Sequence, residues 1–282
     1  MIYIGKYNKL QVLKDTPQGK YLGDDVGNEV LLPNVFIPEG LETGDEIEVF
    51  VYRDSEERPV ATTEKPLATV GEFATLEIGS VLDIGTFFNW GLPKQLLVPK
   101  ALQHKPIVAE DKFHVVHILM DEVTDRIVGT TKISRYLDNS NIEDLSAGDE
   151  VDLIAFHETN LGIKVIINQK HEGLIYRDEI FKPINYGDTF KGYIKKIRAE
   201  NKIDISLEKF GYRKVDPGAE KIMEVLETSD GFLPLHDKSD PELIKKHLGM
   251  SKKVFKKAIG AMYKKRLIRL EKDGIHLNKS GK

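Results

Sequence analysis

Three repeated segments of the chain place an aromatic or cationic side chain at the same position of a short glycine-led pattern. The pattern reads Gly19-Lys20-Tyr21-Leu22, then Gly85-Thr86-Phe87-Phe88, then Gly162-Ile163-Lys164-Val165. Its third position holds Tyr21, Phe87 and Lys164. Flat rings stack on unpaired bases and cations follow a phosphate backbone, so these residue types favour contacts with single-stranded nucleic acid.

The second segment carries three candidate rings. Phe87 and Phe88 are neighbours on an expected strand, so their side chains point to opposite faces. Because Tyr21 and Lys164 are not ideal core residues, the repeat favours Phe87 as the exposed stacking platform. Trp90 is a further candidate for RNA binding, although a glycine follows it and leaves its direction open. The alternative is that all three rings are core, since large aromatic side chains are mostly buried.

The third segment offers cations and one more ring. Tyr176 would supply a stacking surface, and five basic side chains could converge on one side of the segment, namely Lys164, Lys195, Lys196, Arg198 and Lys202. Neighbours on a strand alternate between faces, so an ordinary solvated surface explains Lys195 and Lys196 equally well.

The C-terminal part of the chain has a strongly basic stretch. Residues 250–270 contain eight basic residues and no acidic one. On a helix that begins after Ser251, an apolar stripe of Phe255, Ile259 and Met262 would face inward. The opposite side would carry lysines that could follow phosphates. The candidates are Lys253, Lys256, Lys257 and Lys264, with Arg269 and His276 extending the patch on a hairpin. The alternative is a helix that lysines merely keep soluble.

The sequence offers little for catalysis or metal binding. His114 and His117 would lie on opposite faces of a strand, because they are three residues apart. Zinc-protease, phosphate-loop and nucleophile-elbow motifs are missing. The 282 residues include no cysteine, which excludes disulfides, thiolate metal sites and cysteine nucleophiles. We therefore expect that the protein is not an enzyme and that it has no catalytic residue, metal or cofactor. No small-molecule substrate is evident.

Charge is distributed unevenly along the chain. Residues 1–65 hold 7 basic and 13 acidic side chains, whereas residues 215–282 hold 15 and 10. This asymmetry points to a polyanionic partner for the tail. No apolar run approaches the roughly 18–20 residues of a membrane span, and the N-terminus lacks the pattern of a signal peptide. We expect a cytoplasmic protein with no membrane partner.

Short strands would position the first three sets of residues. Each segment closes with a long strand of alternating polarity, a polar turn and a final short strand. The long strands are expected at Asp45–Tyr52, Lys112–Met120 and Thr189–Ile197. Units of about 65–75 residues with five or so strands fit a five-stranded Greek-key barrel, the OB-fold. We place these barrels at residues 1–65, 66–138 and 139–214.

Beyond residue 215 the apolar period becomes helical. Asp240 before Pro241 is a strong helix start, and Gly249 ends that helix. Asp273-Gly274 marks a tight hairpin turn. Three helices followed by a hairpin predict a winged helix-turn-helix domain in residues 215–282. The expected fold class is therefore multidomain and mainly β, with an α+β C-terminal domain.

The third segment resembles the RNA-binding S1 domain repeated in the largest small-subunit ribosomal protein. The resemblance is carried by Gly148-Asp149-Glu150-Val151, Gly162-Ile163-Lys164-Val165, Glu172-Gly173-Leu174-Ile175-Tyr176, Gly187-Asp188-Thr189-Phe190 and Lys202-Ile203-Asp204-Ile205-Ser206-Leu207. The second segment looks like a variant of this domain, and the first is the most divergent. Three such units and a winged helix are similar, end to end, to the conserved virulence factor B family of bacteria.

This resemblance implies positions for a nucleic-acid face. The exposed aromatic position of the S1 domain maps to Tyr21, Phe87 and Lys164. Its histidine position maps to Leu32, Val98 and Tyr176, so no unit keeps the histidine. Its charged turn positions map to Asp121 and Arg126 in the second unit and to Arg198 and Lys202 in the third. The resemblance also implies a cytoplasmic RNA-binding regulator of bacterial gene expression.

The leading hypothesis is a non-enzymatic protein whose second and third barrels and basic winged helix share one single-stranded RNA, as a post-transcriptional regulator. One alternative is a transcriptional regulator in which the winged helix binds DNA. Another is an adaptor whose barrel loops dock on the ribosome or on RNA polymerase.

Overall fold

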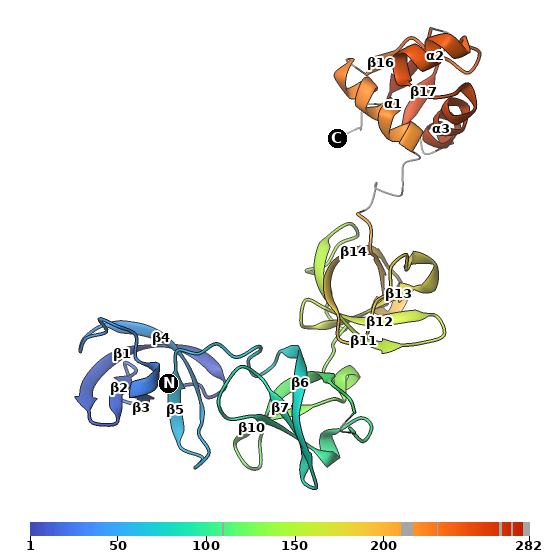
Figure 1. Cartoon of the computed structure of the whole chain (residues 1–282). Helices are drawn as coiled ribbons and strands as arrows, with labels where there is room; N and C mark the ends of the chain where they lie inside the picture. Colours follow the sequence, from blue (N-terminus) through green and yellow to red (C-terminus); the bar gives the residue numbers. More distant parts are fainter. Residues whose placement is uncertain (109, 210–216, 230, 265–266, 272, 279–282) are drawn as a thin grey trace. The chain divides into compact units, whose positions relative to one another are not determined.

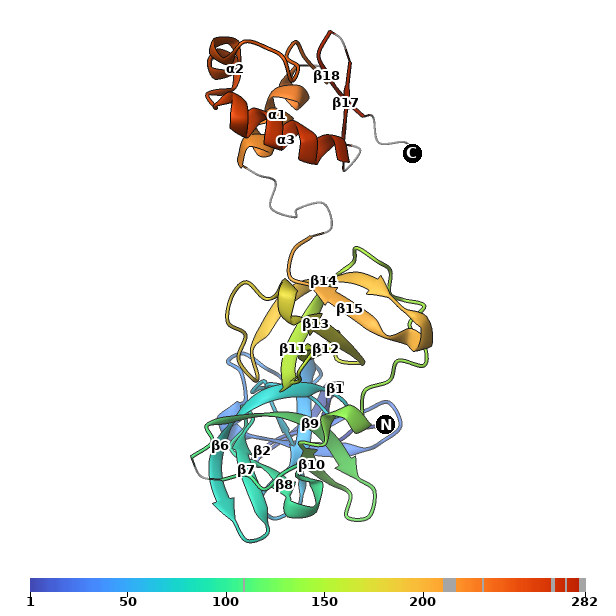
Figure 2. The same ribbon diagram turned by 90° about the vertical axis from the view of Figure 1, so that its right-hand side faces the viewer.

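The computed structural model describes residues 1–108, 110–209, 217–229, 231–264, 267–271 and 273–278. The chain divides into two compact units, residues 1–207 and 208–282. Figures 1 and 2 show the strand-built first unit in blue through yellow and the helical second unit in orange and red. No helix in the described residues is long and apolar enough to cross a membrane.

The first barrel is a closed five-stranded sheet. Its strands are β1 (Lys6–Thr16), β2 (Gly19–Gly23), β3 (Glu29–Pro33), β4 (Glu46–Arg53) and β5 (Pro59–Thr62), and a 3-10 turn, η1 (Asn34–Phe36), follows β3. The strands close in the order β1-β2-β3-β5-β4. Alternation buries one side chain in two along β1 and fills the barrel with aliphatic residues such as Leu10, Leu22 and Val49.

The second sheet arranges its five strands in the equivalent order, but hydrogen bonds among the described residues do not close it into a barrel. Its order is β10-β9-β6-β7-β8. The strands are β6 (Phe73–Leu82), β7 (Gly85–Asn89), β8 (Leu96–Pro99), β9 (Phe113–Asp121) and β10 (Arg126–Thr130), with 3-10 turns η2 (Lys100–Leu102) and η3 (Ile133–Arg135). The two edges still face each other, because a Cβ on Gly129 of β10 would lie 2.8 Å from Val98 of β8.

The third barrel is closed in the order β11-β12-β13-β15-β14, which repeats the first. Its strands are β11 (Glu150–Glu158), β12 (Gly162–Ile167), β13 (His171–Tyr176), β14 (Thr189–Ile197) and β15 (Ile203–Ser206). The 3-10 turns η4 (Arg177–Glu179) and η5 (Ala199–Asn201) precede and follow β14.

The glycine of the repeated pattern has a physical cause. Gly19, Gly85 and Gly162 open the second strand of each barrel with φ values of +152°, +154° and +155°. A Cβ there would lie 2.1, 2.4 and 1.9 Å from the carbonyl oxygens of Leu32, Val98 and Ile175. The second strand crosses the third too closely for any side chain, so each barrel needs glycine at this point.

Neighbouring barrels of the first unit share buried cores. Phe50, Tyr52 and Val60 of the first barrel belong to one apolar cluster with Trp90 and Leu92 of the second. A different cluster joins the second barrel to the third. Its buried members are Phe73, Val115, Ile133, Ile154, Phe156 and Ile166. Each shared core couples adjacent barrels, since separating them would return apolar area to water.

His117 lies beside the second of these shared cores. Its ring is 7% exposed and lies between Phe73 and Tyr136, with ring centroids 4.4 Å away on each side. Burial lowers the pKa of His117 to about 4, although a hydrogen bond to the backbone of Glu72 acts in the opposite direction. The structure therefore favours the neutral imidazole.

The second unit is a winged helix, with elements α1 (Pro217–Thr228), β16 (Phe232–Leu233), α2 (Pro241–Leu248), α3 (Lys252–Lys264), β17 (Ile268–Leu270) and β18 (Ile275–Leu277). The expected start and end of α2 are confirmed. Asp240 accepts a hydrogen bond from the backbone N–H of Glu242 at 2.8 Å, and Gly249 ends the helix in the left-handed conformation. The short strand β16, which the sequence did not suggest, pairs with β18 and completes a three-stranded sheet.

Candidate nucleic-acid interface

The outer face of the third barrel carries the most complete set of expected contacts. The register of β12 on β13 places Lys164 beside Leu174 and Gly162 beside Tyr176. Tyr176 is half-buried, and the Arg198 guanidinium lies 6.0 Å from its ring centre. Arg198 also donates to Asp204 at 3.0 Å, and this bond fixes the cation beside the ring.

Lys164 stands at the edge of the same face. Its ammonium donates to Glu172 at 2.6 Å, and the other oxygen of that carboxylate accepts a hydrogen bond from Ser134 of η3 at 3.2 Å. The side chain of Lys164 stays about one-third exposed. The ion pair orients the lysine toward the second barrel and leaves part of it open to a ligand.

The other cations of the third barrel do not all converge. Lys195 pairs with Glu179 at 2.5 Å, whereas its neighbour Lys196 is exposed. Lys202 pairs with Glu200 at 2.7 Å within the turn that follows β14. Glu200 has a positive φ of 62° there, so the turn is tight. Of the two cations that flank this turn, Arg198 is the one whose guanidinium lies over the ring of Tyr176.

In the second barrel the two phenylalanines point as the alternation suggests. Phe88 is fully buried in the barrel core, and Phe87 is half-buried on the opposite face of β7. The orientation of Phe87 thus allows the stacking that the repeat suggests for it.

Trp90 has a different place, and a stacking role for it is excluded by its burial. The ring is 3% exposed and packs edge-on against Phe50, with centroids 5.9 Å apart. Its Nε1–H donates to the carbonyl of Lys94 at 2.6 Å. Trp90 is part of the core shared by the first two barrels, and no face of its ring is open to a base.

Asp121 and Arg126 bracket a turn that faces the first barrel. Arg126 lies 3.4 Å from Glu57 of the first barrel, and Arg53 of β4 pairs with Asp125. Asp121 accepts hydrogen bonds from Thr124 at 2.6 Å and from the backbone of Val123, which lower the pKa of its carboxyl. Both site candidates therefore have structural partners, and Arg126 is directed to the contact between barrels.

The lysines of α3 lie where the helical pattern places them. Phe255, Ala258, Ile259 and Met262 are buried in the core of the second unit. Lys253, Lys256, Lys257 and Lys264 are exposed. On the following hairpin, Arg269 is exposed and lies 3.6 Å from Glu271. This exposed row of cations has the geometry of a helix that contacts phosphates.

One group of possible metal ligands occurs on the same hairpin. Ligand atoms of Glu271, Asp273 and His276 all lie within 4.8 Å of one another. His276 pairs with Asp273 at 3.2 Å, and this contact lowers the pKa of the carboxyl of Asp273. Ion pairs within the hairpin account for the arrangement, and we assign no metal to it.

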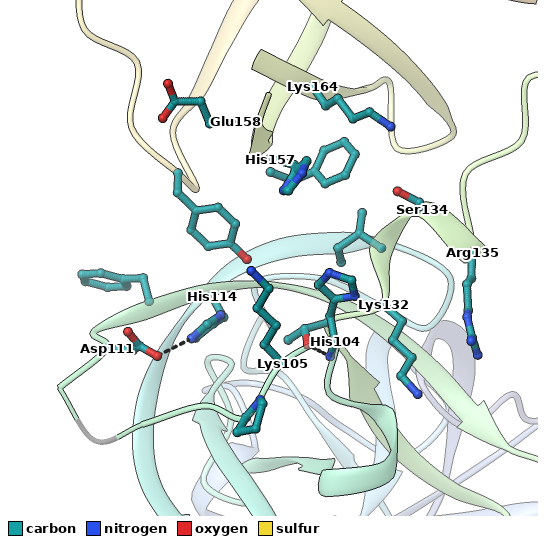
Figure 3. A pocket seen from close by; sticks show the side chains of 16 residues that line it. His104, Lys105, Asp111, His114, Lys132, Ser134, Arg135, His157, Glu158 and Lys164 are labelled. Carbon is teal, nitrogen blue, oxygen red and sulfur yellow. Dashed lines mark hydrogen bonds and ion pairs between the residues drawn. The ribbon is translucent and has the colours of Figure 1, made fainter. Parts of the chain in front are cut away.

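The sequence did not reveal a groove between the second and third barrels (Figure 3). It has a volume of about 1000 Å³. Of the expected site residues only Lys164 lines it; the rest of its basic lining comes from His104, Lys105, His114, Lys132, Arg135 and His157. Most of these lie in connecting segments outside the repeated pattern. The available signal was the two short basic segments at residues 104–105 and 132–135, which only folding brings together.

Comparison with known proteins identifies both kinds of domain. Residues 4–64 match the model of the S1 domain, and residues 220–277 match that of the CvfB-like winged helix domain. The S1 match falls on the first barrel, although the sequence pattern of this barrel is the most divergent of the three. The chain therefore contains an S1 domain and a winged helix domain, and these two types of domain support a nucleic acid as its partner.

Several bacterial proteins are similar along most of the chain. The uncharacterized protein YitL of Bacillus subtilis is 27% identical, over 92% of this chain and 89% of its own. Conserved virulence factor B of Staphylococcus saprophyticus is 24% identical, over 86% of this chain and 82% of its own. A crystal structure of a multidomain protein with nucleic acid binding domains from Streptococcus pneumoniae is 23% identical and covers 98% of both chains, with a TM-score of 0.49. The expected resemblance to conserved virulence factor B is confirmed.

Proposed function

We propose that this chain, which resembles conserved virulence factor B over most of its length, is a non-enzymatic RNA-binding protein that regulates bacterial gene expression after transcription. The observation that carries the proposal is the outer face of the third barrel. There a tyrosine ring, the Arg198 guanidinium beside it and the Lys164 ammonium occupy one surface of β12, β13 and the turn before β15. A single strand needs this combination, because its bases stack on rings and its phosphates attract cations.

Single-stranded RNA is favoured over duplex because the rings are accessible. A duplex keeps its bases stacked on one another and offers mainly phosphates to a protein surface. Tyr176 and Phe87 would add nothing to duplex binding, whereas each stacked base contributes roughly 1–3 kcal/mol on a single strand. In the proposal the second and third barrels and the winged helix contact the same RNA.

A competition experiment tests the proposal. The full chain is bound to a labelled, unstructured single-stranded RNA at low salt, and unlabelled single-stranded RNA or duplex DNA is added at the same salt concentration. We expect the RNA to compete at much lower concentration. Log affinity should fall with log salt by about 0.7 for each phosphate contacted.

The α3 lysines support one second candidate, a DNA-binding regulator led by the winged helix. If duplex DNA competes better than single-stranded RNA, that candidate replaces the proposal. If neither nucleic acid binds at low salt, both are wrong, and a protein-docking adaptor becomes the better hypothesis.

A further inference from the structure

The groove between the second and third barrels is formed by residues of both barrels, which are packed together in the first unit. Ile133 and Phe156, which line it, belong to the buried cluster that joins the two barrels. Hydrogen bonds also cross the contact. The backbone N–H of Phe73 donates to Gln169 at 2.6 Å, the Thr75 hydroxyl to the carbonyl of Gly187 at 2.6 Å, and the backbone N–H of Val115 to the Tyr186 hydroxyl at 3.0 Å.

The charge of the groove is predominantly positive. Its lining includes four cations, Lys105, Lys132, Arg135 and Lys164, and two carboxylates, Asp111 and Glu158. Both carboxylates already have partners. Asp111 lies 3.2 Å from the ring of His114, and Glu158 lies 3.1 Å from Arg177. The groove therefore offers more positive than negative charge to an incoming ligand.

Two of the four cations have no partner among the residues that the structure describes. Lys132 donates to the carbonyl of Ala101 at 2.6 Å, and Lys164 is paired with Glu172. Lys105 and Arg135 are exposed, and neither side chain makes a hydrogen bond or ion pair with any described residue of the chain. Figure 3 shows Lys105 reaching from the second barrel toward the third, with Lys132 and Arg135 at one end of the groove.

The groove also presents two exposed rings. Phe113, the first residue of β9, is 50% exposed, and Tyr186 is 47% exposed. Tyr186 is held in place because its hydroxyl accepts the Val115 N–H at 3.0 Å and its ring meets His114 edge-on, with centroids 5.9 Å apart. Rings with one face open and the other side anchored are suited to base stacking.

The groove continues onto the outer face of the third barrel. His157 of β11 pairs in register with Lys164 of β12, and Lys164 pairs with Leu174 of β13. This row of neighbours leads from the groove toward Tyr176, two residues beyond Leu174. An RNA strand that lies on Tyr176 and Arg198 would reach the groove along this row, across β13, β12 and β11.

We propose that this groove is a second binding segment for single-stranded RNA, in which Lys105 and Arg135 contact phosphates and Phe113 and Tyr186 stack on bases. The proposal rests on the proposed function. It adds that the two barrels form one continuous site rather than two separate ones, so a longer strand makes interactions that a short one cannot reach.

The test uses the full chain and unstructured single-stranded RNA of two lengths, about 5 and about 15 nucleotides, chosen from the range of sites seen on OB-folds. Lys105→Glu and Arg135→Glu are each compared with Lys65→Glu, which makes the same kind of charge change at an exposed lysine outside the groove. Phe113→Leu is compared with Phe113→Tyr, which keeps a ring.

We expect Lys105→Glu and Arg135→Glu to weaken binding of the long RNA about tenfold or more beyond Lys65→Glu, and to leave binding of the short RNA unchanged. Phe113→Leu should weaken binding of the long RNA, whereas Phe113→Tyr, which keeps a ring, should bind it as the unaltered chain does. Inorganic tripolyphosphate should compete no better than its ionic strength accounts for, since the site also needs bases.

The outcomes separate this inference from the proposed function. If the unaltered chain binds neither RNA, the proposed function itself fails. If the chain binds RNA and Arg198→Glu weakens it, but the groove variants behave like Lys65→Glu, only the groove is excluded. Strong competition by tripolyphosphate would identify a site for free anions and overturn the RNA assignment.

Discussion

The orientation of Phe87 on β7 leads to a prediction at the scale of a single residue. Phe87→Ala should weaken binding of single-stranded RNA by roughly 1–3 kcal/mol, because one stacked base loses its ring. Its free energy of unfolding should change little, since the ring is only half-buried. Phe88→Ala is the matched control. This substitution leaves a cavity in the barrel core and should lower the free energy of unfolding by about 3–5 kcal/mol.

RNA titration and denaturant unfolding of the two variants measure both quantities. If Phe87→Ala unfolds the protein as readily as Phe88→Ala does, Phe87 is structural and not a stacking residue.

His117 predicts a pH dependence of stability. Its folded-state pKa of about 4 lies below the ordinary histidine value of about 6.5. The unfolded chain therefore takes up a proton at higher pH than the folded chain does. The stability that this residue supports is complete above the ordinary value and is lost as pH falls toward about 4. The loss is at most about 3 kcal/mol.

Denaturant unfolding between pH 8 and pH 4 measures this contribution by comparison of the native chain with His117→Leu. Other groups titrate in both proteins, so the difference between the two curves isolates the histidine. A difference that stays constant over the range would show that His117 does not control acid stability.

Individual residues were predictable from the sequence where their neighbours are local, and not where their neighbours are remote. Strand alternation put Phe87 and Phe88 on opposite faces, and the repeat indicated that Phe87 is the outer one. The prediction for Trp90 was wrong because the ring that covers it, Phe50, lies 40 positions earlier and in another barrel. The partner of Arg126, Glu57, is also in the first barrel, but Arg126 stays exposed, so its role in RNA binding stays a prediction. Nothing near either residue in the sequence indicates these partners.

At the scale of elements, the glycine that opens the second strand of each barrel should be essential. Gly162→Ala would place a Cβ 1.9 Å from the carbonyl oxygen of Ile175. We expect a loss of at least about 2 kcal/mol in the free energy of unfolding. Gly148→Ala is the control, because Gly148 also has a positive φ but open space around it. It should lose only about 1 kcal/mol from backbone strain.

Thermal and denaturant unfolding distinguish the two variants. Equal losses would mean that backbone strain alone explains the glycine and that the approach of β12 to β13 does not matter.

The recurrence of this glycine was visible in the sequence, and so were the long strands and the start and end of α2. Their causes are local: alternation, turn residues and helix caps. The short β16 and the open edge of the second sheet depend on neighbours brought together by folding.

For the whole molecule, the exposed lysines of α3 predict a salt-dependent contribution to binding. Replacement of Lys253, Lys256 and Lys257 by glutamate should weaken binding of single-stranded RNA. The slope of log affinity against log salt should become shallower by about 0.7 for each phosphate that the helix no longer neutralises. Folding should be largely unchanged, because these side chains face solvent. Lys65→Glu again serves as the control for charge reversal away from α3, with one reversal against three.

Titration at several salt concentrations gives both the affinity and the slope. Undiminished affinity in the triple variant would make the winged helix a module that docks on another protein.

The groove and the shared cores also limit how the chain can be divided into fragments. A cut near residue 139 would expose Ile154, Phe156 and Ile166, which are buried against the second barrel. Variants of the full chain are therefore better probes than isolated barrels.

The burial of Trp90 also makes the protein its own spectroscopic reporter. The chain contains a single tryptophan, and its indole lies in the core shared by the first two barrels, close to Phe50 and Tyr52. Intrinsic fluorescence excited at the indole band therefore comes from one known place. Its emission should be blue-shifted while the two barrels remain docked, and should shift to the red when they part. Separation of the first barrel could thus be followed in real time, without a dye and independently of events in the winged helix.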